Sequence, residues 1–247
     1  MSETKVYLLD VEGTVAPISL TADLLFPYAR KHFANFLEQQ FYASAWPDLA
    51  LLIQENGMES EAGSPRIPYS RLPNPDEELL IPDFQLRALD YLHWLMDRDR
   101  KSTALKSLQG KIWKAGFESG ELKGTLFPDV PAAFVRWSAN ARIVIYSSGS
   151  VEAQRLLFRH SIFGDLTSHI AGYFDTRTGT KQTSASYAAI AAAMNVTPAE
   201  VLFFSDAVRE LNPAREAGCQ TRLVVREGNA PVDDANGHAA VESFAVL

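Results

Sequence analysis

The first regular element of the chain is predicted in the stretch Val6-Tyr7-Leu8-Leu9-Asp10-Val11-Glu12-Gly13-Thr14. Its first four residues form a short run with strong β preference, and two carboxylates and a glycine follow almost directly. A buried strand that stops at carboxylates and a glycine is the usual beginning of an α/β unit. The stretch therefore predicts a strand over 6–9 with a polar loop at its carboxyl end.

After residue 127 the apolar pattern alternates between strand-like and helical segments. Strands are predicted over 142–146, 170–174, 201–204 and, as the last one, 221–225. Helices are predicted over 130–140, 151–160 and 184–194, and a further helix is predicted after Asp206 that ends at Ala217. Strands that alternate with helices indicate right-handed βαβ units, so we expect an α/β fold with a doubly wound parallel sheet.

The segment between the first strand and this alternating region has a different pattern. Helical periodicity covers 23–42, resumes at Asp83 and continues over 103–117, while seven prolines and glycines interrupt 57–82. The sequence thus predicts an α/β core made of 1–17 and 125–247, with a mostly helical insert over 18–124.

Composition restricts the classes of partner. The 247 residues include 23 Lys and Arg against 30 Asp and Glu, which gives a net charge of −7. Such a balance disfavours a broad surface for nucleic acid or anionic membranes. The single cysteine, Cys219, cannot form an intrachain disulfide, and no apolar run reaches the length of a membrane span. We expect a cytoplasmic protein without a nucleic-acid or membrane partner.

Polar clusters follow three of the predicted strands, and a lysine lies in a fourth loop. Ligands of open parallel sheets bind outside the carboxyl ends of the strands, so these side chains are the candidate site. They are Asp10 with Glu12, Ser147 with Ser148, Asp206 with Glu210, and Lys181.

These residue types suit phosphoryl transfer. Asp10 and Asp206 offer oxygen ligands for Mg²⁺, and Asp10 can also act as a nucleophile that forms an acyl-phosphate. Lys181 supplies positive charge against the repulsion between a carboxylate and a phosphate. Glu12 is placed to protonate the leaving oxygen and then to activate water.

Two further features are expected to contact the phosphate group. Gly13 lets the backbone approach closely, so that N–H groups can surround phosphate oxygens. Ser147 and Ser148 offer hydroxyl donors to the same group.

Each cluster also has a purely structural interpretation. Asp10 and the Ser147–Ser150 run can cap helices, Asp206 with Glu210 can complement a helix dipole, and Lys181 can be a solvated loop charge. Their joint occurrence, in order, at successive strand ends favours a phosphate-handling site. No P-loop or dinucleotide-binding glycine pattern follows a strand, and the five histidines lack metal-ligand spacing.

The same residues resemble the four motifs of the haloacid dehalogenase-like phosphatases. The usual first motif is Asp-x-Asp-Gly-Thr, and Glu12 in place of its second acid is similar to one branch, the enolase-phosphatases (acireductone synthases) of methionine salvage. Nearly the whole chain resembles that branch, most clearly in residues 25–28, 99–110, 146–154 and 172–176.

The resemblance implies a Rossmann-like core with an inserted helical cap and one Mg²⁺. The ion would be held by the Asp10 carboxylate, the Glu12 backbone carbonyl and Asp206, with Glu210 behind them. Ser147, Ser148 and Lys181 would contact the substrate, with Gly13 and Thr14 beside it, and the family is largely monomeric.

The implied substrate is 2,3-diketo-5-methylthiopentyl-1-phosphate, which is enolised and then dephosphorylated to the acireductone 1,2-dihydroxy-3-keto-5-methylthiopentene. Abstraction of the carbon-bound proton by Glu12 is our hypothesis. Two alternatives remain open: a Mg²⁺-dependent phosphomonoesterase of the same superfamily that acts on another small metabolite, and a binding module without catalytic activity. Mg²⁺-dependent formation of the acireductone from the diketo phosphate would distinguish the enolase-phosphatase from the phosphomonoesterase. An Asp10→Asn variant with unchanged cellular function would favour the binding module.

Overall fold

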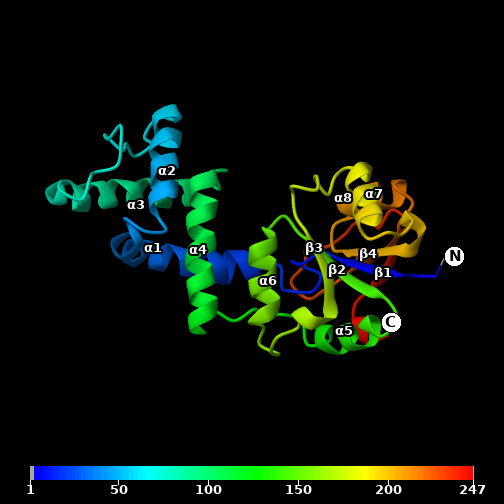
Figure 1. Cartoon of the computed structure of the whole chain (residues 1–247). Coiled ribbons are helices and arrows are strands. Elements are labelled where there is room, and N and C mark those ends of the chain that lie inside the picture. The colour runs from blue at the N-terminus through cyan, green and yellow to red at the C-terminus, as the bar shows by residue number, and fades with distance from the viewer. Residues whose placement is uncertain (1–2, 247) are drawn as a thin grey trace. The chain divides into compact units, whose positions relative to one another are not determined.

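A six-stranded, fully parallel sheet forms the centre of the α/β part of the chain in the computed structural model, which describes residues 3–246 (Figure 1). The strand order is β3-β2-β1-β4-β5-β6. The strands span Val6–Leu9 (β1), Arg142–Tyr146 (β2), Ile170–Phe174 (β3), Val201–Ser205 (β4), Gln220–Val224 (β5) and Ala239–Val241 (β6). The parallel sheet, with helices on both faces, confirms the predicted fold class.

The position of β1 determines where a ligand can bind. β1 pairs with β2 on one side and β4 on the other, so that Leu9 lies opposite both Ile145 and Phe204. From β1 the chain builds the sheet in one direction through β2 and β3, and in the other through β4, β5 and β6. The carboxyl ends of β1 and β4 therefore flank the topological switch point, where open α/β sheets bind their ligands.

Eight α-helices and several short helical turns accompany the strands in the described residues. The helices are α1 (Phe26–Gln40), α2 (Trp46–Met58), α3 (Ile81–Asp97), α4 (Thr103–Ser119), α5 (Val130–Ser138), α6 (Val151–Arg159), α7 (Ser184–Ala193) and α8 (Val208–Glu216). A π-helix covers Leu20–Leu25, and 3-10 turns cover Glu78–Leu80, Thr167–His169, Pro198–Glu200 and Phe244–Val246. Helices α1, α2, α3 and α5 each carry a proline in their first turn, where its missing N–H costs no hydrogen bond.

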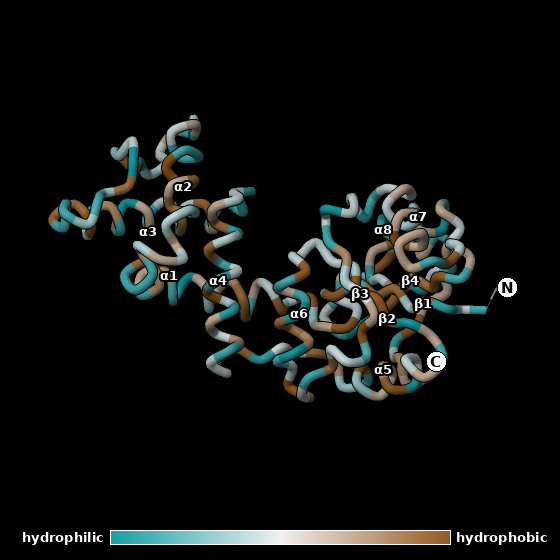
Figure 2. Tube along the Cα trace, in the orientation of Figure 1, coloured by the Kyte–Doolittle hydropathy of each residue, from teal (hydrophilic) through white to brown (hydrophobic). Residues whose placement is uncertain are grey.

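Helices bury both faces of the sheet. Tyr187 and Ile190 of α7 and Leu211 of α8 pack with Val6 and Leu8 on one face. On the other face Trp137 of α5 stacks on Tyr7, with 4.5 Å between ring centroids. Figure 1 shows α7 and α8 on the opposite side of the strands from α5. Burial on both faces requires apolar strands, and β4 (VLFFS) and β2 after its first residue (RIVIY) have this character, in agreement with the brown segments near these labels in Figure 2.

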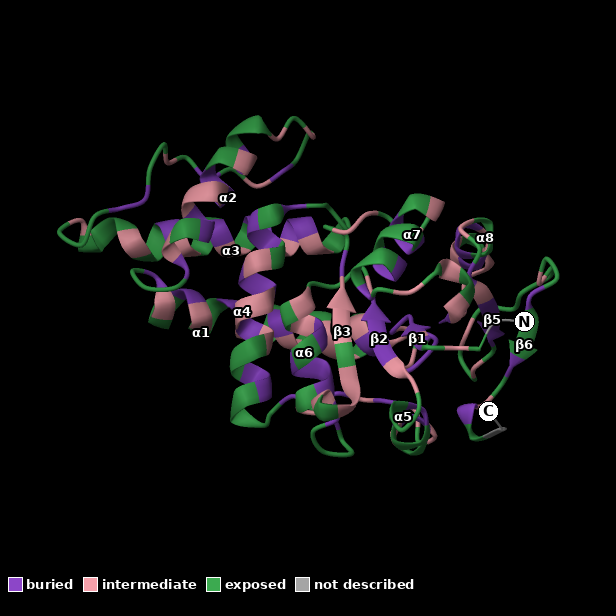
Figure 3. Cartoon of the chain, turned by 45° about the vertical axis from the view of Figure 1, so that its right-hand side comes forward, coloured by how far each residue is buried: buried purple, intermediate pink, exposed green. Residues whose placement is uncertain are grey.

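The edge strands of the sheet are β3 and β6, and the sequence predicted only β3. β3 is the edge strand beside β2 and is only partly buried, in contrast to β1 and β2 (Figure 3). At the other edge, β6 pairs with β5 through Leu223 and Ala240. The prediction that the strand near 221–225 is the last one was therefore wrong, because three residues are too short to give a periodic signal.

The chain divides into two compact units. One comprises Met1–Thr21 and Phe117–Leu247, and the other comprises Ala22–Gly116. The sequence placed the corresponding boundaries at 17/18 and 124/125. The π-helix over Leu20–Leu25 and the end of α4 continue through the observed boundaries, so no change in composition marks them.

The helical unit has its own apolar core. Phe33 and Leu37 of α1, Phe84 and Leu92 of α3, and Leu108 of α4 are almost completely buried in it. The proline- and glycine-rich residues between α2 and Glu78 form no helix or strand, as the sequence predicted. None of the helices in residues 3–246 has the length and apolar character to cross a membrane.

Candidate active site

The loop after β1 is folded into a tight turn around one carbonyl group. Val11 O accepts hydrogen bonds from Thr14 N (3.2 Å), Val15 N (2.9 Å) and Ala16 N (2.9 Å). Asp10 stands immediately before this turn, is 8% exposed, and accepts the Val11 N–H at 2.7 Å through Oδ1. Its own N–H donates to Phe204 O of β4 (3.0 Å), which fixes Asp10 at the switch point.

The turn differs from the expected phosphate cradle. Gly13 N donates to Ala16 O at 2.8 Å and Thr14 N donates to Val11 O, so both N–H groups are engaged in the backbone of the turn. The Thr14 side chain is fully buried, and its hydroxyl lies inside the fold rather than at the mouth of the site. The sequence could not show this, because the hydrogen bonds depend on how the turn closes on itself.

Lys181 connects two of the predicted acids. Its ammonium group donates to Asp10 Oδ1 and, at 3.0 Å, to Glu210 Oε2 of α8. Glu210 Oε2 also accepts the hydroxyl of Ser205 at 3.0 Å. Burial disfavours the charged form of the lysine, but the carboxylates of Asp10 and Glu210 outweigh it and raise the pKa of Lys181. Lys181 is therefore a buried cation held by two acids, not a solvated loop charge.

Burial dominates the electrostatics of the two aspartates. It raises the pKa of Asp10 to about 7, with Lys181 acting in the opposite direction and Glu210 adding to the increase. Burial and the nearby Glu210 likewise raise the pKa of Asp206. Both shifts mean that negative charge is costly here, so the site gains from additional positive charge.

Asp206 packs directly against the turn after β1. Gly13 has a φ of +71°, and a Cβ atom built on it would lie 2.3 Å from Asp206 Oδ2. Only a glycine allows both this backbone conformation and this close approach. The contact between Asp206 and the Gly13 backbone thus brings together the motif after β1 and the motif after β4.

The side chains of Glu12 and the two serines make no hydrogen bond with this cluster in the described residues. Glu12 Oε1 accepts the Thr21 N–H at 3.1 Å. Ser147 Oγ accepts the Gly149 N–H at 3.2 Å, and Ser148 is exposed. Ser150 caps α6 by accepting the Ala153 N–H, so the helix-cap interpretation applies to Ser150 rather than to Ser147 or Ser148.

The residues present fit a hard cation such as Mg²⁺. Three carboxylates, those of Asp10, Asp206 and Glu210, accompany one ammonium group, which leaves two negative charges when all are ionised. Oxygen donors of this kind suit Mg²⁺, which takes few protein ligands. No group of three His, Cys, Asp or Glu side chains in residues 3–246 forms a complete metal cage, and the expected set needs only two carboxylates and the Glu12 carbonyl.

Two residues that the sequence did not single out support the turn from the loop between β5 and β6. Asn229 Nδ2 donates to Gly13 O at 2.9 Å, and Arg226 Nε donates to Thr14 O at 3.3 Å. Asn229 Oδ1 is buried without a hydrogen-bond partner and lies on the same side of Gly13 as Asp206. Both residues follow the predicted strand 221–225 within four positions, so the polar run Arg226–Asn229 at that strand end was the signal that could have identified them.

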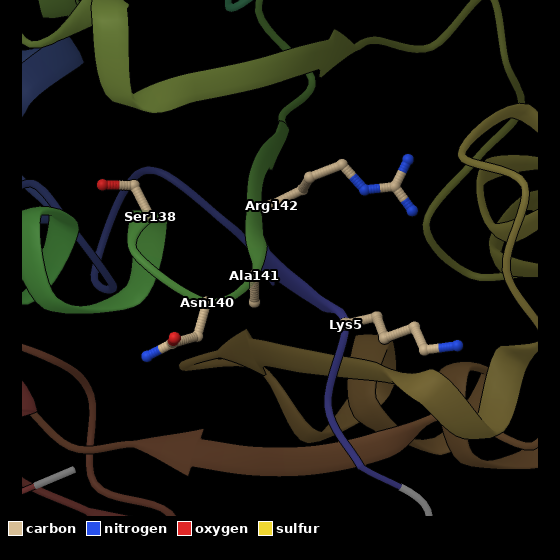
Figure 4. A pocket seen from close by; sticks show the side chains of 5 residues that line it. All are labelled: Lys5, Ser138, Asn140, Ala141 and Arg142. Atoms are coloured by element: carbon tan, nitrogen blue, oxygen red, sulfur yellow. The ribbon is translucent and has the colours of Figure 1, made fainter.

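A shallow depression lies at the amino ends of the strands, whereas the candidate site lies at their carboxyl ends. It has a volume of about 340 Å³ and is lined by Lys5, Ser138, Asn140, Ala141 and Arg142. Figure 4 shows the side chains of Lys5 and Arg142 extending to the same side. The depression is at the amino end of β2 and contains none of the predicted site residues.

Comparison with known proteins shows the family. Residues 4–218 match the model of the haloacid dehalogenase-like hydrolases. An enolase-phosphatase E1 from Synechococcus elongatus is 51% identical over 228 residues, covering 92% of this chain and 90% of that protein. One from Leptospira borgpetersenii is 40% identical over 241 residues, covering 97% and 96%.

A solved structure agrees with this relationship over the whole chain. The crystal structure of the UTR4 protein from Saccharomyces cerevisiae is 33% identical, covers 99% of this chain and 100% of its own, and superposes with a TM-score of 0.73. The resemblance found in the sequence motifs is confirmed by these matches. The chain belongs to the haloacid dehalogenase-like hydrolases and, within them, to the enolase-phosphatase E1 family.

Proposed function

We propose that this chain is a Mg²⁺-dependent enolase-phosphatase that converts 2,3-diketo-5-methylthiopentyl-1-phosphate to the acireductone and phosphate in methionine salvage. The observation that carries the proposal is the buried Lys181 ammonium group shared by Asp10 and Glu210 at the switch point. The enolase-phosphatase E1 relatives, at up to 51% identity among those compared, support the same activity.

Asp10, Asp206 and the backbone carbonyl of Glu12 are the residues that would hold Mg²⁺. When bound, the ion supplies a Lewis acid and neutralises charge on oxygen atoms of the phosphate group. The contact between Asp206 and Gly13 supports this set, because it brings the Asp206 carboxylate to the turn that contains the Glu12 carbonyl.

Asp10 is the proposed nucleophile. Its Oδ1 atom is engaged by the Val11 N–H and by Lys181, which leaves Oδ2 without a hydrogen bond in residues 3–246. Attack by a carboxylate oxygen forms a bond to phosphorus while the bond from phosphorus to the enol oxygen breaks. Water then hydrolyses the acyl-phosphate, which releases phosphate and restores the Asp10 carboxylate.

Glu12 is the proposed proton carrier. Its Oε1 atom accepts the Thr21 N–H, and its Oε2 atom makes no hydrogen bond in the described residues. In the phosphatase step Glu12 gives a proton to the leaving oxygen and then takes one from the attacking water. In the preceding enolase step Glu12 takes the carbon-bound proton, and the Lys181 ammonium stabilises the negative charge of the enolate. Ser147 and Ser148 donate hydroxyl hydrogen bonds to the substrate.

The activity is tested with the purified protein, MgCl₂ and the diketo phosphate. Acireductone formation is followed by the ultraviolet absorbance of its conjugated enediol, and phosphate release is measured in parallel. We expect both products, their loss with EDTA, and loss of phosphate release in Asp10→Asn. Asp233→Asn, at an exposed aspartate of the same unit, is the matched control and should retain activity. Phosphate release from other phosphomonoesters but not from the diketo phosphate would instead support the simple phosphomonoesterase.

The role of Glu12 in enolisation is tested by Glu12→Gln. The amide keeps the size of the side chain but cannot accept the carbon-bound proton. We expect exchange of the substrate's acidic C–H with solvent deuterium, measured by NMR, to fall by at least about a hundredfold, the usual contribution of a general base. Exchange at the wild-type rate would reject Glu12 as the base.

We infer further that the enzyme is a monomer that works in the cytoplasm. The supporting observation is the one cysteine, Cys219, whose thiol is buried and whose pKa burial raises to about 12. Such a thiol is unsuited to an intermolecular disulfide. Light scattering coupled to size exclusion should give a mass near the 27.3 kDa of one chain, and a dimer mass would reject the inference.

A further inference from the structure

The loop that carries Lys181 is attached to the core by hydroxyl groups at three consecutive carbonyls. Tyr146 OH donates to Gly179 O at 2.9 Å, Ser186 Oγ donates to Thr180 O at 2.7 Å, and Tyr187 OH donates to Lys181 O at 2.8 Å. Both tyrosines are fully buried and Ser186 is 3% exposed. Each hydroxyl satisfies a carbonyl that would otherwise require water or a turn of its own.

The close approach of the loop depends on Gly179. Its φ is +140°, a conformation that disfavours other residues, and a Cβ atom there would lie 2.3 Å from Ser186 Oγ. The Ser186 oxygen also accepts a hydrogen bond from Thr183 Oγ1 at 2.8 Å, because its own hydrogen is directed to Thr180 O. The backbone around Lys181 therefore has little freedom to move relative to β2 and α7, which carry Tyr146, Ser186 and Tyr187.

The lysine side chain continues from this anchored backbone to the two acids. Its side chain is 11% exposed, and Nζ lies 5.7 Å from the centroid of the Tyr146 ring. The Tyr146 and Tyr187 rings meet edge to face, 5.8 Å apart, beneath it. Because a lysine side chain has four rotatable carbon bonds, fixing its backbone and packing its stem are what determine the position of the ammonium group.

We propose that Tyr146, Ser186 and Tyr187 are positioning residues that hold the Lys181 ammonium group at the reacting atoms, through the three carbonyls of residues 179–181. The three residues are buried and their hydroxyl hydrogens are directed to the loop backbone, so they act on the loop and not on the substrate. The proposal rests on the function assigned above to Lys181. It assigns a role in catalysis to residues that neither bind metal nor take part in a chemical step.

The test compares Tyr146→Phe and Tyr187→Phe with a matched control, Tyr173→Phe. Tyr173 lies on the neighbouring strand β3 and has a buried hydroxyl without a hydrogen-bond partner in the described residues. Lys181 acts on charge that develops in the transition state, so a displaced ammonium group should lower kcat and kcat/KM together and leave KM within about twofold. We expect decreases of about tenfold for each of the two variants and none for Tyr173→Phe.

A purely structural role is distinguished by measuring stability in the same samples. If the hydroxyls only stabilise the fold, the melting temperature falls while kcat per folded molecule, corrected by circular dichroism, stays at the wild-type value. That result would overturn the proposal. If a phenylalanine variant does not fold, Ser186→Ala replaces it, with the same expected loss of kcat at unchanged KM.

The outcomes also separate this proposal from the proposed activity. A wild-type protein without Mg²⁺-dependent turnover of the diketo phosphate would contradict the activity itself. An active wild type whose Tyr146→Phe and Tyr187→Phe variants match Tyr173→Phe would contradict only the positioning role.

Discussion

Gly13 shows at the scale of one residue how backbone conformation and chemistry are linked. Its φ of +71° lets the chain turn sharply after Glu12, and its missing Cβ leaves room for the Asp206 carboxylate. Asn229, which lies on the same side of Gly13 as Asp206, also donates from Nδ2 to the Gly13 carbonyl. A single position thus satisfies a conformational need and a packing need together, and substitutions there should affect both.

We predict that Gly13→Ala weakens Mg²⁺ binding strongly, because the new methyl group displaces Asp206. Strain alone is expected to cost about 1 kcal/mol of folding free energy. Gly164→Ala is the matched control: it has a φ of +91° in the same unit, and its Cβ would meet no atom within 4 Å. Titration calorimetry with MgCl₂ and urea unfolding measure the two effects. Equal Mg²⁺ affinities in the two variants would contradict the packing argument.

At the scale of elements, the irregular segment after α2 is held by side chains instead of a backbone ladder. Asn56 donates to Pro65 O and accepts the Ile67 N–H, both at 2.8 Å. Glu77 accepts two hydrogen bonds of 2.8 Å from Arg71 and one of 2.7 Å from Asn74 N. Prolines exclude regular structure here, so these polar contacts replace the missing backbone hydrogen bonds.

The Glu77 contacts predict a pH dependence of stability. Arg71 first, and then the Asn74 N–H, lower the pKa of Glu77 to about 2. A carboxyl group with a lowered folded pKa stabilises the fold above its unfolded pKa, about 4.3, and this stabilisation is lost as the pH falls towards the folded value. The melting temperature of Glu77→Gln should therefore lie below that of the wild type at about pH 7, with the gap closing towards pH 2.

The control for this prediction is the exposed neighbour Glu78, which has no ion pair in the described residues. Glu78→Gln should have the same melting temperature as the wild type at each pH. A gap for Glu77→Gln that stays constant across the acid range would mean that the carboxylate charge is not what stabilises the segment.

At the scale of the whole α/β unit, one ion pair connects segments that are distant in the sequence. Arg226 Nη1 donates to Asp129 Oδ2 at 2.8 Å and to Glu242 O at 3.0 Å, and its guanidinium lies 4.5 Å from the ring centroids of Phe127 and Phe244. Asp129 Oδ2 also accepts the Phe244 N–H at 2.6 Å. Together with the bond from Arg226 to Thr14 O, these contacts tie the carboxyl-terminal segment to the start of α5 and to the loop after β1.

We predict that Arg226→Ala lowers the free energy of unfolding by about 3 kcal/mol, because it leaves the Asp129 carboxylate buried without its cation. The Arg226 and Asp129 side chains are only 6% and 12% exposed. Lys5→Ala is the comparison: it removes a pair with Glu200 in which the lysine is 56% exposed, and it should cost at most about 1 kcal/mol. Urea unfolding of both variants measures the difference. Similar losses in the free energy of unfolding would show that burial does not make the Arg226–Asp129 pair more stabilising than the exposed one.

The secondary structure of this chain was determined largely by local sequence pattern. The periodic segment α4 and the apolar run β2 were predicted close to their observed bounds, and the start of α3 was predicted within two residues, because periodicity is a property of the segment itself. β6 was missed because it is three residues long and is defined by pairing with β5. The same limit applies to the boundaries of the helical unit, which lie within helices.

Some features of the candidate site likewise follow from local sequence pattern, and others depend on contacts between distant segments. The pattern of strands and helices was enough to predict which acids and serines follow strands and that Lys181 lies in a loop, because the carboxyl ends of parallel strands lie on one side of the sheet. The folded chain was needed to see that Lys181 joins Asp10 to Glu210 and that the N–H groups of the Gly13 turn bond within the turn. The same holds for the residues that support these loops, which are Tyr146, Ser186, Tyr187, Arg226 and Asn229. The physical reason is that hydrogen bonds and close packing between distant segments depend on distances that no local pattern encodes.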